Sequence, residues 1–193
     1  MLNDKLKDYN IILGSGSQRR QNFLKDLGIN FIVKPIDVEE EYPKYLHGNE
    51  ITSYLAALKA DAYEEKLKDN DILITADTVV RFSGKILGKP ADLNEAKKML
   101  NELSGQPHEV ITSVCIRTNK ATKIISDTTV VYFENLTAEE IDFYVENYQP
   151  LDKAGGYGIQ EWIGYIAVKK IEGSFFTVMG FPVHKFYKEM MKL

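Results

Sequence analysis

Short apolar runs separated by polar turns dominate the first part of the chain, and their spacing predicts alternating strands and helices. Residues 11–13, 31–33 and 72–74 are compact apolar runs of the kind found in buried strands. Between the first two runs, apolar positions with a helical period predict a helix over residues 18–27, which Gly28 terminates. Strands that alternate with helices in this way indicate an α/β fold.

Further helices are predicted where a capping residue precedes apolar positions spaced by about 3.6 residues. Asp92 and Thr137 each have a glutamate three residues later, which is the pattern of a capping box. The predicted helices run from Asn49 to about Leu67, from Asp92 to about Leu103 and from Thr137 to about Tyr148, with a last one after Pro182.

The remaining strands are predicted from alternating apolar and polar positions. They are Val79–Phe82, Lys85–Leu87, Glu109–Arg117, Lys123–Phe133, Tyr165–Val168 and a last one between a turn at Gly173 and Met179. Ser83-Gly84 between the first two is a hairpin signal. Because some strands pair as hairpins, we expect a mixed sheet flanked by helices. No repeat or linker divides the chain, so residues 1–193 are expected to form one domain.

Composition narrows the class of protein. The net charge of −4 at pH 7 does not suit a general nucleic-acid binder, which needs a basic face. No apolar run approaches the roughly 18 residues of a membrane span, and the first ten residues lack the apolar region of a signal peptide. Cys115 has no cysteine to pair with and lies in an apolar run, which indicates a buried, inert thiol. We therefore expect a cytoplasmic protein without membrane or nucleic-acid partners.

The segment from Gly14 to Arg20 combines glycines, serines and two adjacent arginines at the start of a predicted helix. Glycines let backbone amides approach an anion, and a helix N-terminus adds positive potential. Arg19 and Arg20 oppose the helix dipole unless a bound phosphate neutralises them. A plain loop with two solvated arginines is the alternative, since the segment is neither a Walker loop nor a dinucleotide fingerprint.

Carboxylates gather at two places. Asp37 to Glu41 form an acidic loop that either binds a hard cation such as Mg²⁺ or Mn²⁺ or is a solvated turn. Asp77 closes the apolar run that begins at Ile72, where α/β enzymes often place a carboxylate that binds a metal or takes a proton from water. Capping of the next turn is the competing, structural role for Asp77.

Two lysines and a glutamine complete the candidates. Lys59, in the long helix, and Lys89, next to a proline, can each hold a phosphate as a point charge, although single lysines are commonly solvated. Gln160 ends a glycine-dense segment that starts at Asp152, and its amide can both donate to and accept from a uracil or thymine edge; otherwise the segment is only a turn. The three histidines lack metal-ligand spacing and receive no role.

Taken in order, these segments resemble the motifs of the Maf family of nucleotide pyrophosphatases, over about residues 11–182. The matching segments are Ser15-Gly-Ser-Gln-Arg-Arg20, Glu39-Glu40, Ala76-Asp-Thr-Val-Val80, Gly88-Lys-Pro90, Lys153-Ala-Gly-Gly-Tyr-Gly-Ile-Gln160 and Gly173 to Pro182. Each segment alone is weak, but six in the family's order make a specific resemblance.

The resemblance implies a role for each matching residue. Asp77 would be the general base and, together with Glu40, would bind a divalent cation, Mg²⁺ or Mn²⁺, with Glu39 as a substitute for Glu40. The substrate-binding residues would be Ser17, Arg19, Arg20, Lys59 and Lys89. In the branch of the family that acts on dTTP and UTP, specificity would rest on Arg19, Thr78 and Gln160.

The resemblance also implies a fold like that of inosine-triphosphate pyrophosphatases: a twisted mixed sheet with flanking helices and a deep cleft, in a homodimer. The implied reaction is hydrolysis of dTTP or UTP to the monophosphate and pyrophosphate, which would also remove non-canonical nucleotides. The same chemistry on a modified purine triphosphate, and a non-catalytic regulator of cell division, are the alternatives. The chain departs from the family pattern at Glu161-Trp162, where Trp162 could stack on a base or edge the pocket.

Overall fold

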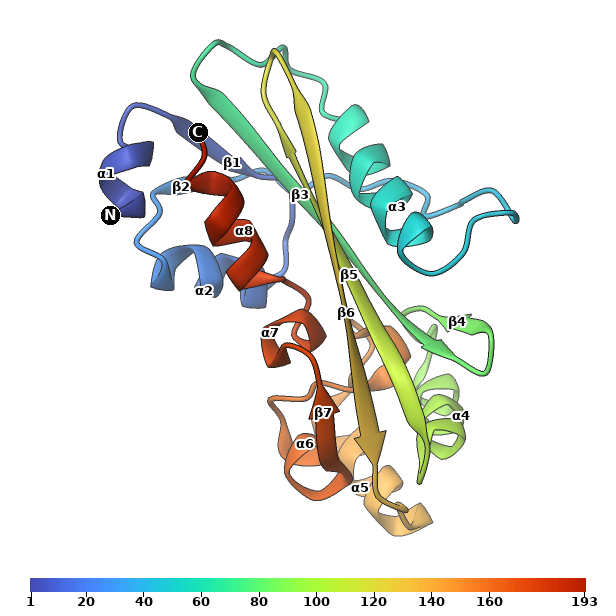
Figure 1. Ribbon diagram of the computed structural model, residues 1–193. Coiled ribbons are helices and arrows are strands. Elements are labelled where there is room, and N and C mark those ends of the chain that lie inside the picture. The colour runs from blue at the N-terminus through green and yellow to red at the C-terminus, as the bar shows by residue number, and fades with distance from the viewer. The chain divides into compact units, whose positions relative to one another are not determined.

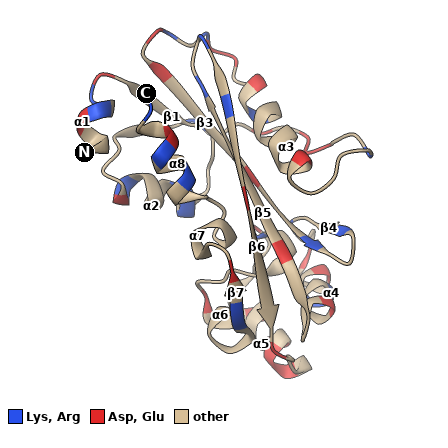
Figure 2. Ribbon diagram, viewed as in Figure 1, with Lys and Arg blue, Asp and Glu red and all other residues tan.

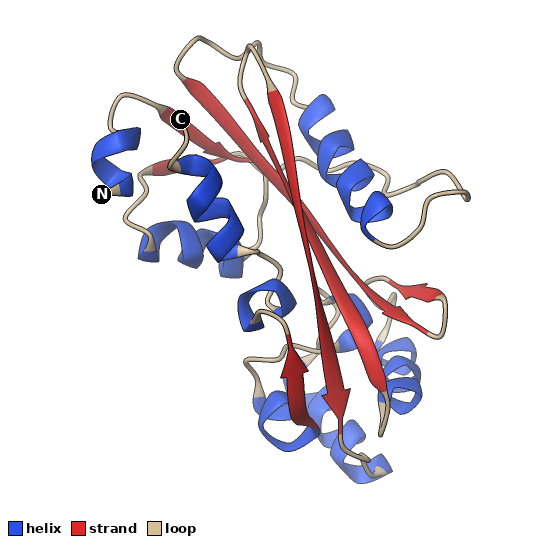
Figure 3. Ribbon diagram, in the orientation of Figure 1, coloured by secondary structure: helices blue, strands red, loops and turns tan.

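A seven-stranded mixed sheet flanked by helices is the frame of the protein, in a computed structural model that describes residues 1–193 (Figures 1 and 3). The strand order is β2-β1-β3-β5-β6-β7, with β4 paired to β3. The strands are β1 Asn10–Leu13, β2 Phe31–Val33, β3 Asp71–Phe82, β4 Lys85–Leu87, β5 Pro107–Arg117, β6 Thr122–Phe133 and β7 Val168–Glu172. β1 is parallel to β2 and β3, whereas the β3–β4 and β6–β7 pairs are antiparallel. The predicted mixed α/β sheet is confirmed.

Most helices lie where capping residues and helical periods predict them. They are α1 Leu2–Leu6, α2 Gln18–Asp26, α3 Asn49–Asp61, α4 Leu93–Leu103, α5 Ala138–Tyr148, the short 3₁₀ turn η1 Ala154–Gly156, α6 Trp162–Ala167, α7 Phe175–Val178 and α8 Val183–Met190. Asp92 caps α4 by accepting a hydrogen bond from the Glu95 amide at 2.8 Å. Thr137 and Glu140 cap α5 reciprocally, so both predicted capping boxes mark real helix starts. The N-terminal α1 is a helix that the pattern did not predict.

The chain forms two compact units. The first comprises Met1–Asp77, Thr112–Asp127 and Gly180–Leu193, and the second comprises Thr78–Ile111 and Thr128–Met179. β3, β5 and β6 each begin in one unit and end in the other. The single domain over residues 1–193 and the deep cleft stay predictions.

In the first unit, α3 covers one face of the strands. Ala56 and Ala60 of α3 pack in a cluster with Ile12 of β1, Leu73 of β3 and Cys115 of β5. The predicted buried thiol is thus confirmed. On the other side of these strands, α2 and α8 lie together (Figure 1), and the ring of Phe181 contacts those of Phe23 and Phe186.

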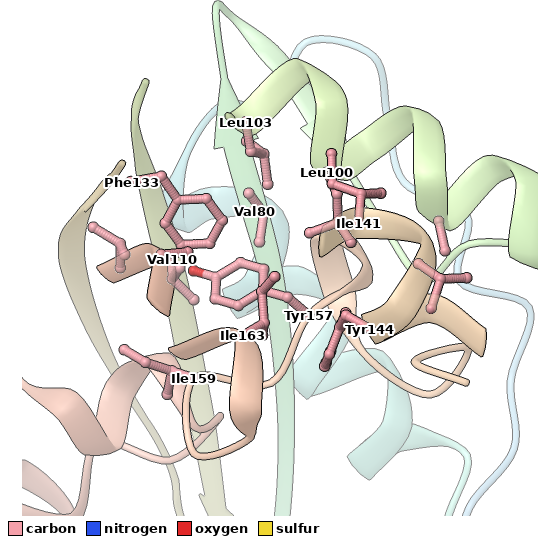
Figure 4. Close-up of a cluster of buried hydrophobic side chains, with 14 residues drawn as sticks. Val80, Leu100, Leu103, Val110, Phe133, Ile141, Tyr144, Tyr157, Ile159 and Ile163 are labelled. Atoms are coloured by element: carbon pink, nitrogen blue, oxygen red, sulfur yellow. The ribbon is translucent and has the colours of Figure 1, made fainter. Parts of the chain in front are cut away.

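The core of the second unit is larger and more aromatic. It gathers residues from α4, α5, α6 and three strands around Phe133, Tyr144 and Tyr157 (Figure 4). The rings of Phe133 and Tyr157 meet edge to face, with centroids 4.9 Å apart. Trp162 packs against Phe143 of α5 at a centroid distance of 4.7 Å and adjoins this core. A contact of Trp162 with a base stays a prediction.

The strand predicted to end at Asp77 continues through Phe82 as β3. Val79 and Val80, both β-branched and buried, extend it, and Asp77 changes the polarity of the strand without interrupting its backbone. Asp77 therefore lies inside a long strand instead of at a strand end.

The helix predicted to reach Leu67 ends at Asp61. From Ala62 to Lys66 most side chains are exposed, so a further helical turn would have no apolar face to bury. Tyr63 and Leu67 still pack against the α3 cluster, but from irregular chain.

Two strands predicted near the C-terminus are wrong. The segment Tyr165–Val168 falls mainly in α6, because Ile163 and Ala167, four residues apart, are buried on one helix face while Tyr165 is 80% exposed. The segment predicted to run as a strand to Met179 contains α7 instead, and the Ser174 carbonyl accepts from the Thr177 amide at 3.1 Å. The strand in this region is β7, at residues 168–172.

None of the helices combines the length and the apolar character needed to cross a bilayer. Basic and acidic positions are interspersed over the elements of both units (Figure 2). Positive charge that could bind phosphates is therefore a local property of particular segments.

Candidate active site

β3 and α3 are held together by polar side chains on the face of β3 that α3 covers. Thr75 and Asp77, two residues apart in the strand, point to the same face. The Thr75 hydroxyl donates to the Ala56 carbonyl of α3 at 2.6 Å. Two residues further along β3, Asp77 meets Lys59, which also belongs to α3. The carboxylate is thus fixed by a regular strand and a packed helix, not by a loop.

Lys59 is buried although it is charged. It follows Ile51 and Leu55 at intervals of four residues, so it continues the buried stripe of α3. Its Nζ lies 2.6 Å from Asp77 Oδ1 and 2.8 Å from Glu40 Oε1. One ammonium group therefore bridges the two carboxylates that the sequence singles out.

Asp77 is only 4% exposed, and its two oxygens have different surroundings. Oδ1 accepts the hydrogen bond from Lys59, whereas Oδ2 is buried and has no hydrogen-bond partner. Burial raises the pKa of Asp77 above the ordinary aspartate value, and the positive charge of Lys59 opposes that rise. A buried carboxylate with one unpartnered oxygen can accept a proton or bind a cation.

Arg20 is anchored by backbone and side-chain oxygens of the same unit. Its Nη1 donates to the Ala76 carbonyl at 3.0 Å and to Ser15 Oγ at 3.1 Å, and its Nε donates to the Gly180 carbonyl at 3.0 Å. Burial lowers the pKa of Arg20 to about 10, and the charge of Asp77 acts in the opposite direction. The guanidinium stays protonated at neutral pH and lies against the residue that precedes Asp77.

Ser17 and Arg19 stand at the start of α2. Ser17 is the N-cap residue, its amide donates to Ser15 Oγ at 3.3 Å, and its side chain makes no capping hydrogen bond. Arg19 is half-buried and close enough to Arg20 to lower the pKa of that guanidinium further. The first unit therefore brings together Glu40, Lys59, Asp77 and Arg20, with Arg19 beside them.

The other predicted site residues belong to the second unit. Lys89 follows Gly88, whose carbonyl accepts from the Gly155 amide at 2.9 Å, so the Lys89 segment is joined to the segment that ends at Gln160. Gln160 Oε1 is buried and has no hydrogen-bond partner. Thr78 is half-buried in β3, next in sequence to Asp77. The roles given to all these residues stay predictions.

A divalent cation fits the carboxylates of the first unit. Glu40 and Asp77 offer hard oxygen ligands, and the buried, unpartnered Asp77 Oδ2 is a ready ligand atom. The protein would contribute these two carboxylates alone, since no group of three or more His, Cys, Asp or Glu side chains is arranged to hold a metal. This donor set suits Mg²⁺ or Mn²⁺, which commonly bind through one or two carboxylates and complete their shell with substrate phosphates and water.

Several residues that contact these sites were not predicted from the sequence. The anchors of Arg20 include two carbonyl oxygens, which no side-chain motif reveals. Lys153 is buried and lies 3.1 Å from the Glu161 carboxylate, which also accepts from the Tyr144 hydroxyl. Lys153 is the first residue of the motif that ends at Gln160. This place in the motif was the one feature of the sequence that indicated a role for Lys153.

Comparison with known proteins agrees with these motifs. The profile of the family described as Maf-like protein matches residues 10–193. A dTTP/UTP pyrophosphatase of Flavobacterium johnsoniae is 52% identical over 193 residues, the full length of both chains. A protein of the same name from Christiangramia forsetii is 50% identical over 193 residues, covering 100% of this chain and 98% of its own. Another from Porphyromonas gingivalis strain W83 is 52% identical over 190 residues, covering 97% and 96%.

Among solved structures, the Staphylococcus aureus Ham1 protein aligns with a TM-score of 0.44 and 16% identity, over 64% of this chain and 71% of its own. The family assignment rests instead on the sequence, where the profile spans nearly the whole chain and half of the residues are shared with full-length relatives. With the six motifs in order, this shows that the chain belongs to the family of Maf-like proteins.

Proposed function

We propose that this protein hydrolyses dTTP and UTP to the nucleoside monophosphate and pyrophosphate. One observation carries the chemistry: Asp77 is buried, Lys59 holds one of its oxygens, and the other has no partner. The substrate follows from the relatives, which share about half of their residues with this chain over at least 97% of its length and are named dTTP/UTP pyrophosphatases.

Asp77 acts as the general base in this proposal. Its carboxylate accepts a proton from a water molecule while the water oxygen attacks the α-phosphorus. The bond from the α-phosphorus to the oxygen shared with the β-phosphorus breaks, and pyrophosphate leaves with that oxygen and its electron pair. Burial raises the pKa of Asp77 above the ordinary aspartate value. Its carboxylate is therefore better matched to proton transfer near neutral pH than that of an exposed aspartate.

The basic residues neutralise the triphosphate. Arg19, Arg20, Lys59 and Lys89 are the four basic residues assigned to the triphosphate, by their charge and by the family motifs that they match. Arg20 keeps its orientation through the carbonyls of Ala76 and Gly180. A guanidinium fixed in this way stabilises developing negative charge without reorganising during the reaction.

A divalent cation is part of the proposal. Glu40 and Asp77 would hold Mg²⁺ or Mn²⁺, and the bound cation would neutralise phosphate charge and polarise a phosphoryl oxygen. Replacing Glu40 by Gln should therefore weaken the metal dependence of the reaction; a metal titration identical to that of the wild type would exclude this ligand.

Specificity for pyrimidines is assigned to Arg19, Thr78 and Gln160. Gln160 supports this most directly. Its buried amide oxygen has no hydrogen-bond partner, and a base could supply the missing donor. Uracil and thymine present such a donor at N3.

The test is pyrophosphate release from a panel of pyrimidine, purine and modified triphosphates with Mg²⁺ and with Mn²⁺. The wild type should act best on dTTP and UTP, and Asp77→Asn should lower kcat by at least about 10²-fold, the usual size of a general-base contribution. Asp71→Asn is the matched control, since Asp71 is also buried in β3 but pairs with Asn10. Full activity of Asp77→Asn would exclude the assigned base, and a preference for a purine substrate would exclude the assigned specificity.

We further propose a cytoplasmic homodimer that binds no nucleic acid. The dimer follows from the family resemblance, the lack of nucleic-acid binding from the net charge of −4, and the reducing compartment from the single cysteine. Light scattering on the purified chain measures the molecular mass, and a mass near twice the 22.0 kDa of one chain would support the dimer.

A further inference from the structure

The segment from Lys153 to Gln160 has a backbone that needs external support. Gly155 adopts φ +70°, a left-handed conformation that favours glycine, and five of the eight residues lie outside η1 and belong to no strand or helix. Glycine-rich chain of this kind stays mobile unless side chains or backbone hydrogen bonds fix it. Gln160 therefore depends on neighbouring groups for a fixed position.

Glu161, the residue after Gln160, uses both of its carboxylate oxygens. Oε1 lies 3.1 Å from Lys153 Nζ, and Oε2 accepts from the buried Tyr144 hydroxyl of α5. Lys153 begins the segment and Glu161 directly follows it, so this ion pair joins the two ends. Because Lys153 is buried and Glu161 is only 20% exposed, the pair is poorly screened by solvent.

The middle of the segment is held by the same group of side chains. The Gly158 amide donates to the Tyr144 hydroxyl at 2.9 Å. A Cβ at Gly158 would lie 2.8 Å from Glu161 Cδ and 2.9 Å from Lys153 Cε, so the backbone passes directly against the ion pair. Lys153, Glu161 and Tyr144, which we call the Glu161 clamp, thus fix the start, the middle and the end of the segment.

The orientation of Gln160 matters because its side-chain amide has an acceptor oxygen on one side and a donor nitrogen on the other. Uracil offers a donor at N3 and an acceptor at O4, whereas cytosine offers an acceptor at N3 and a donor at its amino group. An amide that accepts from uracil N3–H and donates to O4 would have to turn over to pair with cytosine. Discrimination between these bases therefore requires a fixed amide as well as a glutamine.

We propose that the Glu161 clamp is a positioning device that fixes Gln160 and so sets the preference for UTP and dTTP over CTP. The proposal rests on the pyrophosphohydrolase function proposed above. Glu161 and Lys153 act through the backbone of the segment, and neither is assigned contact with the reacting atoms. The clamp also accounts for a charged side chain directly after the base-reading residue.

Two readouts test the clamp in Glu161→Ala and Glu161→Gln: hydrogen exchange of the backbone amides of residues 154–160, and the ratio of kcat/KM for UTP to that for CTP. Glu161→Ala should speed exchange and lower the ratio by about 10- to 100-fold, the cost of a loosely placed substrate contact. Glu161→Gln keeps an acceptor for Tyr144 but loses the charge, so it should fall between the wild type and Glu161→Ala. It also decides the question if Glu161→Ala fails to fold.

Glu134→Gln is the matched control, because Glu134 forms an exposed ion pair with Lys169 at 3.7 Å in the same unit. It should leave both readouts unchanged. An unchanged UTP-to-CTP ratio in both Glu161 variants would overturn the specificity role, even if exchange were faster. If the wild type hydrolysed no triphosphate, the proposed function would fail, and exchange alone would then decide: faster exchange supports the clamp and unchanged exchange overturns it.

Discussion

Lys59 shows how far single residues could be assigned from the sequence. Its spacing of four and eight residues from Leu55 and Ile51 places it on the buried stripe of α3, a signal that the order of residues itself carries. The carboxylates that it bridges, Asp77 and Glu40, were also identified from sequence. The anchoring of Arg20 could not be, because its partners include carbonyl oxygens brought together only by folding.

Replacing Lys59 with Met should move the pH dependence of the reaction. Lys59 opposes the rise in the pKa of Asp77 that burial causes, so its loss should raise that pKa further and reduce the ionised base at a given pH. The acid limb of log kcat/KM against pH should shift to higher pH, whatever the change in the plateau. Lys59→Arg keeps the charge and is the control; an acid limb that stays in place in Lys59→Met would contradict the assignment of Asp77 as base.

His108 should make the protein sensitive to acid. Burial lowers its pKa to about 4 from the ordinary 6.5, so the folded state holds the neutral form where the unfolded chain binds a proton. The stabilisation is complete above pH 6.5 and is lost as the pH falls from 6.5 to 4, by roughly 3 kcal/mol in total.

Urea unfolding at pH 7 and pH 4.5 measures this loss, which should be much smaller in His108→Gln. Tyr157→Phe removes the 2.7 Å hydrogen bond to His108 Nε2 but leaves the ring buried, so it should retain the acid sensitivity. Equal pH dependence in His108→Gln and the wild type would show that another group is responsible.

At the scale of whole elements, the sequence was reliable where a cap or a long alternation was present. The capped helices α4 and α5 and the long strands β5 and β6 were placed nearly at their observed bounds. Short segments failed: α6 has six residues and α7 has four, and a few apolar positions fit either period. The continuity of β3 through Asp77 was also not predicted, since the pairing of this charged residue with Lys59 of α3 arises only in the folded chain.

The turn at η1 depends on close packing as well as on backbone freedom. Gly155→Ala would place a methyl group 2.8 Å from Val80 Cγ2 at φ +70°, whereas Gly84→Ala would meet no atom within 4 Å at a similar φ of +78°. Strain at positive φ should cost each variant about 1 kcal/mol. Gly155→Ala should lose a further 1–3 kcal/mol, roughly, from overpacking.

Chemical denaturation of the two variants measures the difference. Adding Val80→Ala to Gly155→Ala should recover part of the packing loss, as a double-mutant cycle would show. Equal stabilities for Gly155→Ala and Gly84→Ala would mean that Val80 does not constrain the turn.

At the scale of the molecule, three strands run through both units, which should make their unfolding cooperative. The chain has one cysteine and one tryptophan, and each reports on a different unit: Cys115 is buried in the first and Trp162 packs in the second. Reaction of the Cys115 thiol and fluorescence of Trp162 should follow the same urea dependence. Separate midpoints would show that one unit unfolds before the other.

The bridge that Lys59 makes between Glu40 and Asp77 bears on the order in which ligands bind. Its ammonium group already offsets the repulsion between the two carboxylates, so a free cation must compete with a charge that belongs to the protein. A bound triphosphate would offer Lys59 phosphate oxygens to contact, which would leave Glu40 and Asp77 available to hold a cation bound to the nucleotide. Binding should therefore be ordered. Calorimetry should show almost no heat of binding for Mn²⁺ alone and clear binding when Mn²⁺ and nucleotide are added together.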